Sequence, residues 1–160
     1  MQKITIGILI GIACALTIST AWRDDYNDHS TRPNQPIAAA PSRQEVKFAR
    51  FFEKKGSPVP VEMAKAVVSQ KRPKLMAAVA VVESNANPNA KGKAGERGAW
   101  QVMPYHGKVS HNVHEQCDQS ARILEELIRE QDGNLKRALA HYNGGDKPKR
   151  VSLAYADKVL

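Results

Sequence analysis

The feature that most restricts how this chain can fold is a long, uncharged, apolar stretch close to its N-terminus. It runs from Ile4 to Trp22 and reads ITIGILIGIACALTISTAW. Because the stretch is apolar on every side, it does not suit an amphipathic helix that covers a small soluble core. It is long enough for a helix to cross the hydrocarbon layer of a membrane. We therefore expect the folded domain to be formed by the residues that follow.

Two interpretations of residues 1–26 stay open. The stretch is either a retained membrane anchor or a signal peptide that is cleaved near Ser19–Ala21. Lipidation at Cys14 is a weaker alternative, because the apolar stretch continues well beyond this residue. Lys3 precedes the stretch and two aspartates follow it, which favours export of the remaining chain. The predicted location is periplasmic or otherwise extracytoplasmic, with an anchor in the inner membrane.

Residues 27–41 have the composition of a linker, and residues 42–160 are predicted to form one domain. The segment NDHSTRPNQPIAAAP contains three prolines and no hydrophobic period. The whole chain carries a formal net charge of +8, from 24 Lys and Arg residues against 16 Asp and Glu residues. This balance favours an acidic or polyanionic partner. Export of the domain excludes chromosomal nucleic acid from that role.

Hydrophobic periodicity predicts that the domain is mainly helical. Ser42 and Glu45 fit a capping box, and Phe48, Phe51 and Phe52 follow on one face. The clearest apolar stripe comes later, between Cys117 and Ile128. The full set of predicted helices covers residues 42–55, 61–70, 73–87, 117–128, 135–142 and 152–160.

The segment from Lys91 to His114 is predicted to be a long loop with at most a small hairpin. It contains Gly92, Gly95, Gly98 and Pro104, which interrupt regular structure. No series of alternating strands is present anywhere, so a β-sandwich or a doubly wound sheet is excluded. The expected fold class is mainly α, with α+β character limited to that hairpin.

Glu83 is the residue whose surroundings most suggest chemistry. It follows the apolar segment MAAVAVV and lies near the C-terminal end of a predicted helix. Desolvation and the negative end of the helix dipole both raise the pKa of a carboxyl group in such a place. A carboxylic acid that stays protonated near neutral pH can act as the general acid that cleaves a glycosidic bond. The alternative is an exposed glutamate in a helix-terminal turn.

Four short motifs in order make the interpretation of Glu83 specific. They are Glu83-Ser84, Asn87-Pro88, the segment GAWQVMP at 98–104 and the segment ALAHYNGG at 138–145. From Leu75 to the C-terminus the chain resembles the soluble lytic transglycosylase family of lysozyme-like, peptidoglycan-cleaving enzymes. The resemblance implies a lysozyme-like helical domain.

The resemblance also implies which residues form the site. Glu83 matches the single catalytic acid of the family. Gln101 and Met103 match residues that line the sugar-binding groove, while Tyr142 and Asn143 match the pair that faces the catalytic carboxyl. The implied reaction cleaves the β-1,4 bond between N-acetylmuramic acid and N-acetylglucosamine and leaves a 1,6-anhydro sugar. Because the substrate's own acetamido group supplies the nucleophile, one carboxyl group is sufficient.

Several positions depart from the family pattern. Gly92 stands where many members have a serine near the catalytic acid, and Ala99-Trp100 replaces Leu-Met. His141 and Gly144 replace two alanines around the Tyr-Asn pair, and Val151 replaces a glutamate. These departures put secondary contacts in doubt, but they leave the acid in place.

Two other functions are kept as alternatives. A hydrolytic muramidase would cleave the same bond with water, and it would need a second carboxylate across the cleft. Asp118, Asp146 and Asp157 are candidates, although none of them lies in a matching motif. The other alternative is a non-catalytic, wall-binding module that helps to assemble a cell-envelope-spanning apparatus.

No metal or other cofactor is expected. His106, His111 and His114 have no carboxylate or cysteine pair at ligand spacing around them. No glycine-rich phosphate loop or nucleotide fingerprint occurs. A short basic run follows the Tyr-Asn pair and suits either a solvated edge or attraction to wall carboxylates; it consists of Lys147, Lys149 and Arg150. The expected partners are therefore peptidoglycan glycan strands and the inner membrane.

Overall fold

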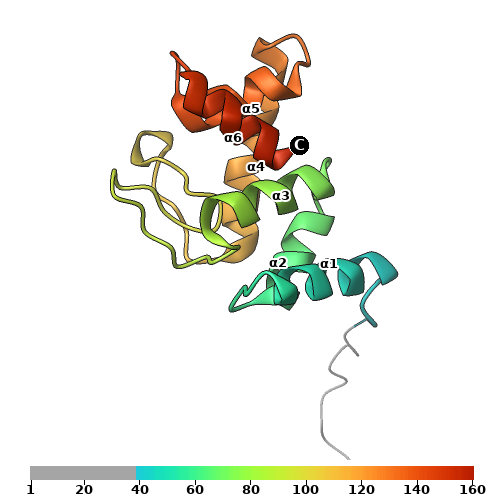
Figure 1. Ribbon diagram of the computed structural model, residues 1–160. Helices are drawn as coiled ribbons and strands as arrows, with labels where there is room; N and C mark the ends of the chain where they lie inside the picture. The colour runs from blue at the N-terminus through green and yellow to red at the C-terminus, as the bar shows by residue number, and fades with distance from the viewer. Residues whose placement is uncertain (1–38) are drawn as a thin grey trace, which may run out of the picture. The chain divides into compact units, whose positions relative to one another are not determined.

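The computed structural model describes residues 39–160, and these form a bundle of helices interrupted by one long loop (Figure 1). The proposed membrane anchor or signal and most of the predicted linker lie outside the described residues. Figure 1 shows the α1–α2 pair at one end and the α5–α6 pair at the other, with α4 between them. The elements are α1 (Arg43–Lys54), α2 (Pro60–Val68), α3 (Pro73–Ser84), the short 3-10 turn η1 (Pro104–His106), α4 (Val113–Glu130), α5 (Leu135–Gly144) and α6 (Arg150–Val159).

The helix boundaries follow local signals in the sequence. The predicted capping box is present at α1, where the Ser42 hydroxyl accepts from the Glu45 backbone N–H and the Glu45 carboxylate accepts from the Ser42 N–H. Prolines occupy the first turns of α2 and α3, where a missing N–H costs nothing. The α4 helix begins at Val113, earlier than predicted, because the Asn112 side chain caps its first turn.

The prediction of a mainly helical fold is confirmed, while the α+β component is wrong for the described residues. The segment between α3 and α4 contains only two isolated antiparallel bridges, Lys91 with Arg97 and Arg97 with Val102, and residues 39–160 include no sheet. Gly95 and Gly98 have positive φ values of 100° and 80°, so the backbone turns before a ladder can extend. The segment is therefore a long loop, as predicted, and its hairpin character is limited to these two bridges.

This loop is tied to the bundle at Ala99-Trp100. The Trp100 side chain is fully buried, and its Nε1–H donates to the Met76 carbonyl of α3 at 3.0 Å. The Ser84 hydroxyl of α3 donates to the Ala99 carbonyl at 2.8 Å. From α4, the buried Gln116 side chain accepts from the Ala99 N–H at 2.9 Å. Two consecutive residues thus connect the loop to two helices.

Gln116 also fixes the far sides of the loop. Its Nε2 donates to the carbonyls of Pro88 and Ser110, at 3.0 and 2.8 Å. Gly98 allows this arrangement, because a Cβ on that residue would lie 2.4 Å from the Gln116 Oε1. One buried amide thus replaces the ladder of hydrogen bonds that a true hairpin would have.

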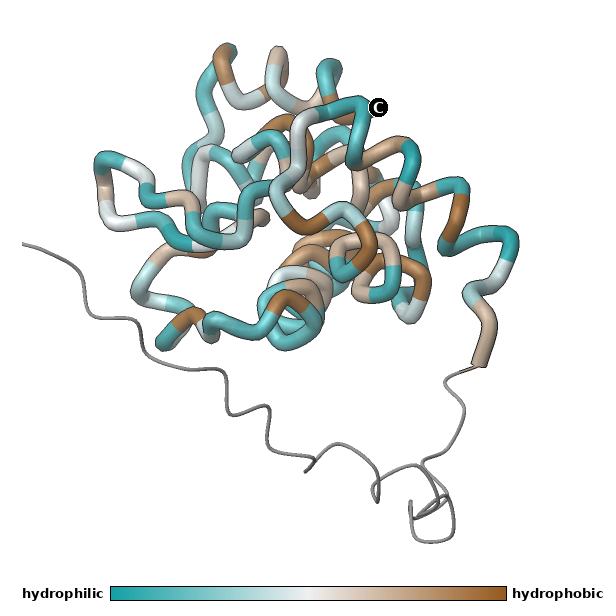
Figure 2. Tube along the Cα trace, turned by 90° about the horizontal axis from the view of Figure 1, so that it is seen from below, coloured by the Kyte–Doolittle hydropathy of each residue, from teal (hydrophilic) through white to brown (hydrophobic). Residues whose placement is uncertain are grey.

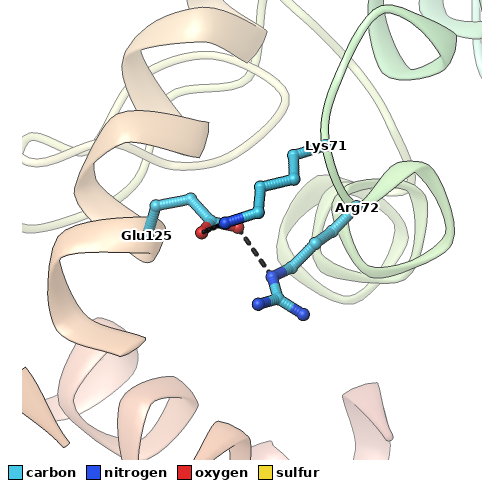
Figure 3. Close-up of polar contacts among 3 residues, drawn as sticks. All are labelled: Lys71, Arg72 and Glu125. Carbon is cyan, nitrogen blue, oxygen red and sulfur yellow. Dashed lines mark hydrogen bonds and ion pairs between the residues drawn. The ribbon is translucent and has the colours of Figure 1, made fainter. Parts of the chain in front are cut away.

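Ion pairs on the surface connect the turn between α2 and α3 to α4 (Figure 3). Glu125 of α4 pairs with the Arg72 Nε at 2.7 Å and with the Lys71 Nζ at 3.2 Å. Exposed pairs of this kind contribute at most about 1 kcal/mol each. The buried apolar side chains therefore stabilise the fold more than these pairs do, and Figure 2 shows brown apolar positions recurring along the helices between teal polar ones.

Within residues 39–160, every helix is too short or too polar to cross a membrane.

Replacing Trp100 tests whether the loop depends on this anchor. We expect Trp100→Ala to lower the free energy of unfolding by about 3–5 kcal/mol, since it leaves a cavity and removes the indole hydrogen bond to the Met76 carbonyl. Chemical denaturation followed by circular dichroism measures this change. Tyr105→Ala is the matched control, because the Tyr105 side chain is 70% exposed. A loss below about 1 kcal/mol for Trp100→Ala would contradict the assigned role.

Candidate active site

Glu83 lies one residue before the end of α3 and is partly buried. Burial raises the pKa of its carboxyl group to about 7, and the negative charge of Glu96 contributes in the same direction. The C-terminal end of the helix dipole also favours the neutral acid. The sequence predicted a raised pKa at this position from desolvation and the helix dipole. The structure adds the negative charge of Glu96 as a further cause.

The turn that follows Glu83 is conformationally costly. Asn85 and Ala86 both have left-handed backbones, with φ values of 54° and 59°. The Ala86 N–H donates to the Ala80 carbonyl, and the buried Ser57 hydroxyl donates to the Ala86 carbonyl at 2.8 Å. A left-handed residue that is not glycine costs roughly 1–2 kcal/mol. The surrounding hydrogen bonds hold this turn and so fix the direction in which α3 ends.

Tyr155 of α6 lies against the Glu83 carboxyl. Its hydroxyl is buried and makes no direct hydrogen bond within residues 39–160. The Tyr155 hydroxyl nevertheless favours the ionised form of Glu83 and so opposes the rise in its pKa. Burial raises the pKa of Tyr155 well above its usual range, so its hydroxyl stays protonated and can donate towards the ionised carboxylate. The sequence analysis placed Tyr155 in the closing helix but gave it no role.

Gly92 and Glu96 fit together on the loop beside Glu83. A Cβ on Gly92 would lie 2.1 Å from the Glu96 Oε2 and 2.8 Å from the Gln101 Oε1. The Glu96 carboxylate is held there by the backbone N–H of Ala94, at 2.9 Å. The Glu96 carboxylate thus occupies the space that a side chain at position 92 would need, where many family members have a serine. Sequence analysis missed Glu96, because it belongs to no motif and only the return of the loop brings it to Gly92.

The structure brings three of the predicted site residues together in one pocket. Gln101, Met103 and Tyr142 line a cleft of about 100 Å³ between the loop, α4 and α5. Gln101 has a left-handed backbone, with φ of 48°, and its Nε2 donates to the Gly98 carbonyl at 2.8 Å. Asn143 is exposed on α5 and does not line this pocket. The remaining lining residues are Val102, Tyr105, His106, Ile123, Leu127, His141, Gly145 and Asp146.

The Tyr142 hydroxyl makes two internal hydrogen bonds. It donates to the Trp100 carbonyl at 2.8 Å and contacts the Ser120 hydroxyl at 2.7 Å. Burial raises the pKa of Tyr142 above its usual range, and the charge of Glu83 adds to this effect. Tyr142 therefore lies close enough to Glu83 to interact with it, while its hydroxyl connects α5 to the loop and to α4.

Gly144, which replaces an alanine of the family pattern, is explained by the close packing of α5 and α6. A Cβ on Gly144 would lie 2.4 Å from the Ser152 Oγ, so glycine lets α5 approach the start of α6. The basic run that follows the Tyr-Asn pair, Lys147, Lys149 and Arg150, is exposed. His141, the other replacement in this motif, lines the pocket described above.

Of the carboxylates considered for a muramidase, only Asp146 lies near the predicted groove residues. It lines the pocket with Gln101 and Tyr142. Asp118 instead accepts from the Gln70 side chain at 2.7 Å, and Asp157 pairs with Lys136 at 2.6 Å on the surface. Neither of these two aspartates lines the pocket.

Other candidate chemistries find no support in the described part of the chain. Residues 39–160 contain no group of three or more His, Cys, Asp or Glu side chains placed to hold a metal ion. Cys117 is a buried free thiol, and burial raises its pKa, so it is a packed core residue and not a nucleophile. Cys14 lies outside the described residues.

Comparison with known proteins identifies the class to which this fold and site belong. Residues 61–159 match the family model of the Transglycosylase SLT domain, and the chain is a member of that family. No curated protein matches the chain significantly. Membership implies peptidoglycan lytic transglycosylase activity in general, peptidoglycan as the substrate, and action outside the cytoplasm.

The raised pKa of Glu83 makes stability depend on pH. A carboxyl whose pKa rises from 4.5 to about 7 on folding stabilises the native state only while it is protonated. Stability is therefore lost as the pH rises from 4.5 to 7. We expect Glu83→Gln to be more stable than the wild type at pH 8, by about 1–3 kcal/mol, and the difference to shrink towards pH 4. Denaturation at both pH values measures it, and a pH-independent difference would show that Glu83 titrates normally.

Proposed function

We propose that this protein is a lytic transglycosylase in which Glu83 is the general acid and then the general base. The observation that carries the proposal is the position of a carboxyl group with a pKa of about 7 at the end of an apolar helix, beside the loop and α6. Such a group is protonated in a useful fraction of molecules at neutral pH and can also accept a proton later. The family match supports the reaction class.

In the proposed reaction, Glu83 protonates the oxygen that links N-acetylmuramic acid to N-acetylglucosamine. The bond to the muramyl C1 breaks, and the acetamido oxygen of the same sugar bonds to C1. Glu83, now a carboxylate, removes the proton from the muramyl C6 hydroxyl, whose oxygen displaces the acetamido oxygen. The product carries a 1,6-anhydro ring, and Glu83 is protonated again. A single carboxyl group serves both steps, as in other substrate-assisted glycosidases.

The neighbouring residues have supporting roles in this proposal. Gln101 and Met103 line the sugar-binding cleft, and Tyr142 fixes the loop through its bond to the Trp100 carbonyl. Asn143, exposed near the end of α5, contacts the bound glycan.

We assign residues 1–26 to a membrane anchor or signal, 27–41 to a linker and 42–160 to the catalytic domain. The domain then works on the periplasmic side of the inner membrane, in wall growth or within a cell-envelope-spanning apparatus.

Glu83→Gln tests the assignment of the acid. The substitution keeps the shape of the side chain but removes the titrating proton, so we expect a fall in activity of about 10²- to 10⁴-fold or more. The measurement is release of soluble muropeptides from purified peptidoglycan. Glu130→Gln, which alters an exposed residue of α4, is the matched control and should retain activity. Near-normal activity of a folded Glu83→Gln protein would refute the role of Glu83.

The chemical end of the product separates this proposal from the muramidase. An intramolecular C6 hydroxyl already lies near the reacting carbon, an advantage that corresponds to a large effective molarity over water. We therefore expect muropeptides that end in 1,6-anhydromuramic acid, lighter by one water than a hydrolysed end and resistant to borohydride. Mass spectrometry measures the ratio of the two ends. Mainly reducing ends would mean that water is activated, and Asp146 at the pocket would then be the first carboxylate to replace.

A further inference from the structure

We propose that a second cleft, formed by the loop between α3 and α4, binds the carboxylates of the peptides that the muramyl sugars of peptidoglycan carry. The cleft has a volume of about 840 Å³, and its lining includes the cationic residues Lys91, Arg97 and Lys108. We call it the basic cleft. The inference rests on the proposed function, because it needs a glycan strand in the neighbouring cleft of Gln101 and Met103, which we call the sugar cleft.

The basic cleft carries positive charge that no carboxylate in its lining balances. Lys91, Arg97 and Lys108 are all exposed, and none of the described aspartates or glutamates lines the cleft with them. The ion pairs within residues 39–160 involve other cations. Glu96, the nearest acid in sequence to two of these cations, accepts a backbone N–H of the loop at 2.9 Å and does not line the cleft. An anion that enters the cleft therefore meets uncompensated positive charge.

Two of these cations are held opposite each other by the backbone. Lys91 and Arg97 form an antiparallel bridge, and the Gly92 N–H beside it donates to the Glu96 carbonyl at 2.9 Å. Like charges directly opposite each other destabilise such a pairing. A carboxylate between the two side chains would remove this repulsion, and a guanidinium group suits a carboxylate because it can donate two parallel hydrogen bonds to it. The arrangement therefore suits a bound carboxylate.

The turn η1 lies between the basic cleft and the sugar cleft. Pro104 and Gly107 line the basic cleft. Tyr105 and His106, which lie between them in sequence, line the sugar cleft. The Gly107 N–H donates to the Pro104 carbonyl at 3.0 Å. From α4, the Gln119 side chain donates to the His106 carbonyl at 3.1 Å. The two clefts are thus neighbours across one turn that hydrogen bonds hold in place.

The peptide of a bound muramyl sugar is long enough to cross this turn. Three residues of 3-10 helix rise about 6 Å in all. An extended peptide of about four residues spans up to about 13 Å. The peptide is attached to the lactyl group of the muramyl sugar, and it carries free carboxylates along its length and at its end. A sugar in the sugar cleft can therefore place its peptide over η1 and into the basic cleft. Asn89, which also lines this cleft, offers a donor and an acceptor to the peptide backbone.

The test compares two substrates of the full-length protein. One is purified peptidoglycan with its peptides, and the other is the same material after an amidase has removed the peptides. Cleavage is counted by mass spectrometry of the released sugar ends, at limiting substrate. The variant carries Lys91→Gln, Arg97→Gln and Lys108→Gln together. All three side chains are exposed, so the fold should be retained.

We expect the ratio of the rates on peptide-bearing and stripped glycan to fall by about 5- to 20-fold in this variant, the effect of losing three partly screened charge contacts. The ratio removes any general change in rate. The matched control carries Lys47→Gln, Arg50→Gln and Lys54→Gln, which remove the same charge from exposed positions of α1. These residues lie outside the basic cleft, so the control should keep the wild-type ratio.

A binding measurement separates this proposal from the proposed function. The Glu83→Gln protein is mixed with insoluble peptidoglycan, and the fraction that sediments gives its affinity. Adding the three substitutions of the basic cleft should weaken binding to peptide-bearing material by a similar factor, and binding to stripped material by less. If Glu83→Gln remained active, the proposed function would be refuted, and the difference in binding would still decide the role of the basic cleft.

Two results would overturn the proposal. The first is a ratio of rates, or of affinities, that the three substitutions in the basic cleft leave unchanged. The second is an equal fall of the ratio in the α1 control, or in a variant that replaces Lys147, Lys149 and Arg150 with glutamine. That result would mean that the net charge of the domain attracts the peptides, and not this cleft.

Discussion

The attachment of the loop at Ala99-Trp100 is the interaction on which the rest of the structure depends. The Trp100 indole donates to α3, the Ala99 N–H donates to Gln116 of α4, and the Trp100 carbonyl accepts from Tyr142 of α5. Three helices, α3, α4 and α5, thus meet at one dipeptide. Because these bonds are shielded from water, each of them costs more to lose than an exposed bond. The loop that carries Gln101 and Met103 and the end of α3 that carries Glu83 are joined at this junction.

The site combines groups that each oppose stability. Glu83 is a partly buried carboxyl, Ala86 has a left-handed backbone, and the Tyr155 hydroxyl is buried against Glu83. Such costs cluster at functional sites, where the surrounding fold holds them in place. The apolar packing of α3 against α2 and α6 is what maintains them here.

The sequence predicted the parts of the fold that depend on local signals. The capping box at Ser42, the proline at the start of α3 and the apolar stripe of α4 all act within a few residues, so their helices were correctly expected. The raised pKa of Glu83 was predicted for the same reason, because an apolar helical segment precedes it directly. The family resemblance from residue 75 onward is confirmed by the match over residues 61–159.

The remaining features depend on contacts between distant residues, which periodicity does not encode. The loop was expected to be at most a hairpin, but its order comes from the Gln116 side chain in α4. Tyr155 approaches Glu83 only because α6 folds back onto α3. Asn143 was grouped with Tyr142 by sequence, and yet neighbouring positions on a helix point in different directions, so only Tyr142 lines the pocket.

The fit between Gly92 and Glu96 has a consequence for how such a site can change by single substitutions. A chain with any larger side chain at position 92 has no room for the Glu96 carboxylate in its present place, since even a methyl group would overlap it. A side chain that replaces glycine at position 92 must displace the Glu96 carboxylate, which is the movable end of a flexible side chain. Glutamate at 96 therefore keeps its present conformation only in a chain that has glycine at 92.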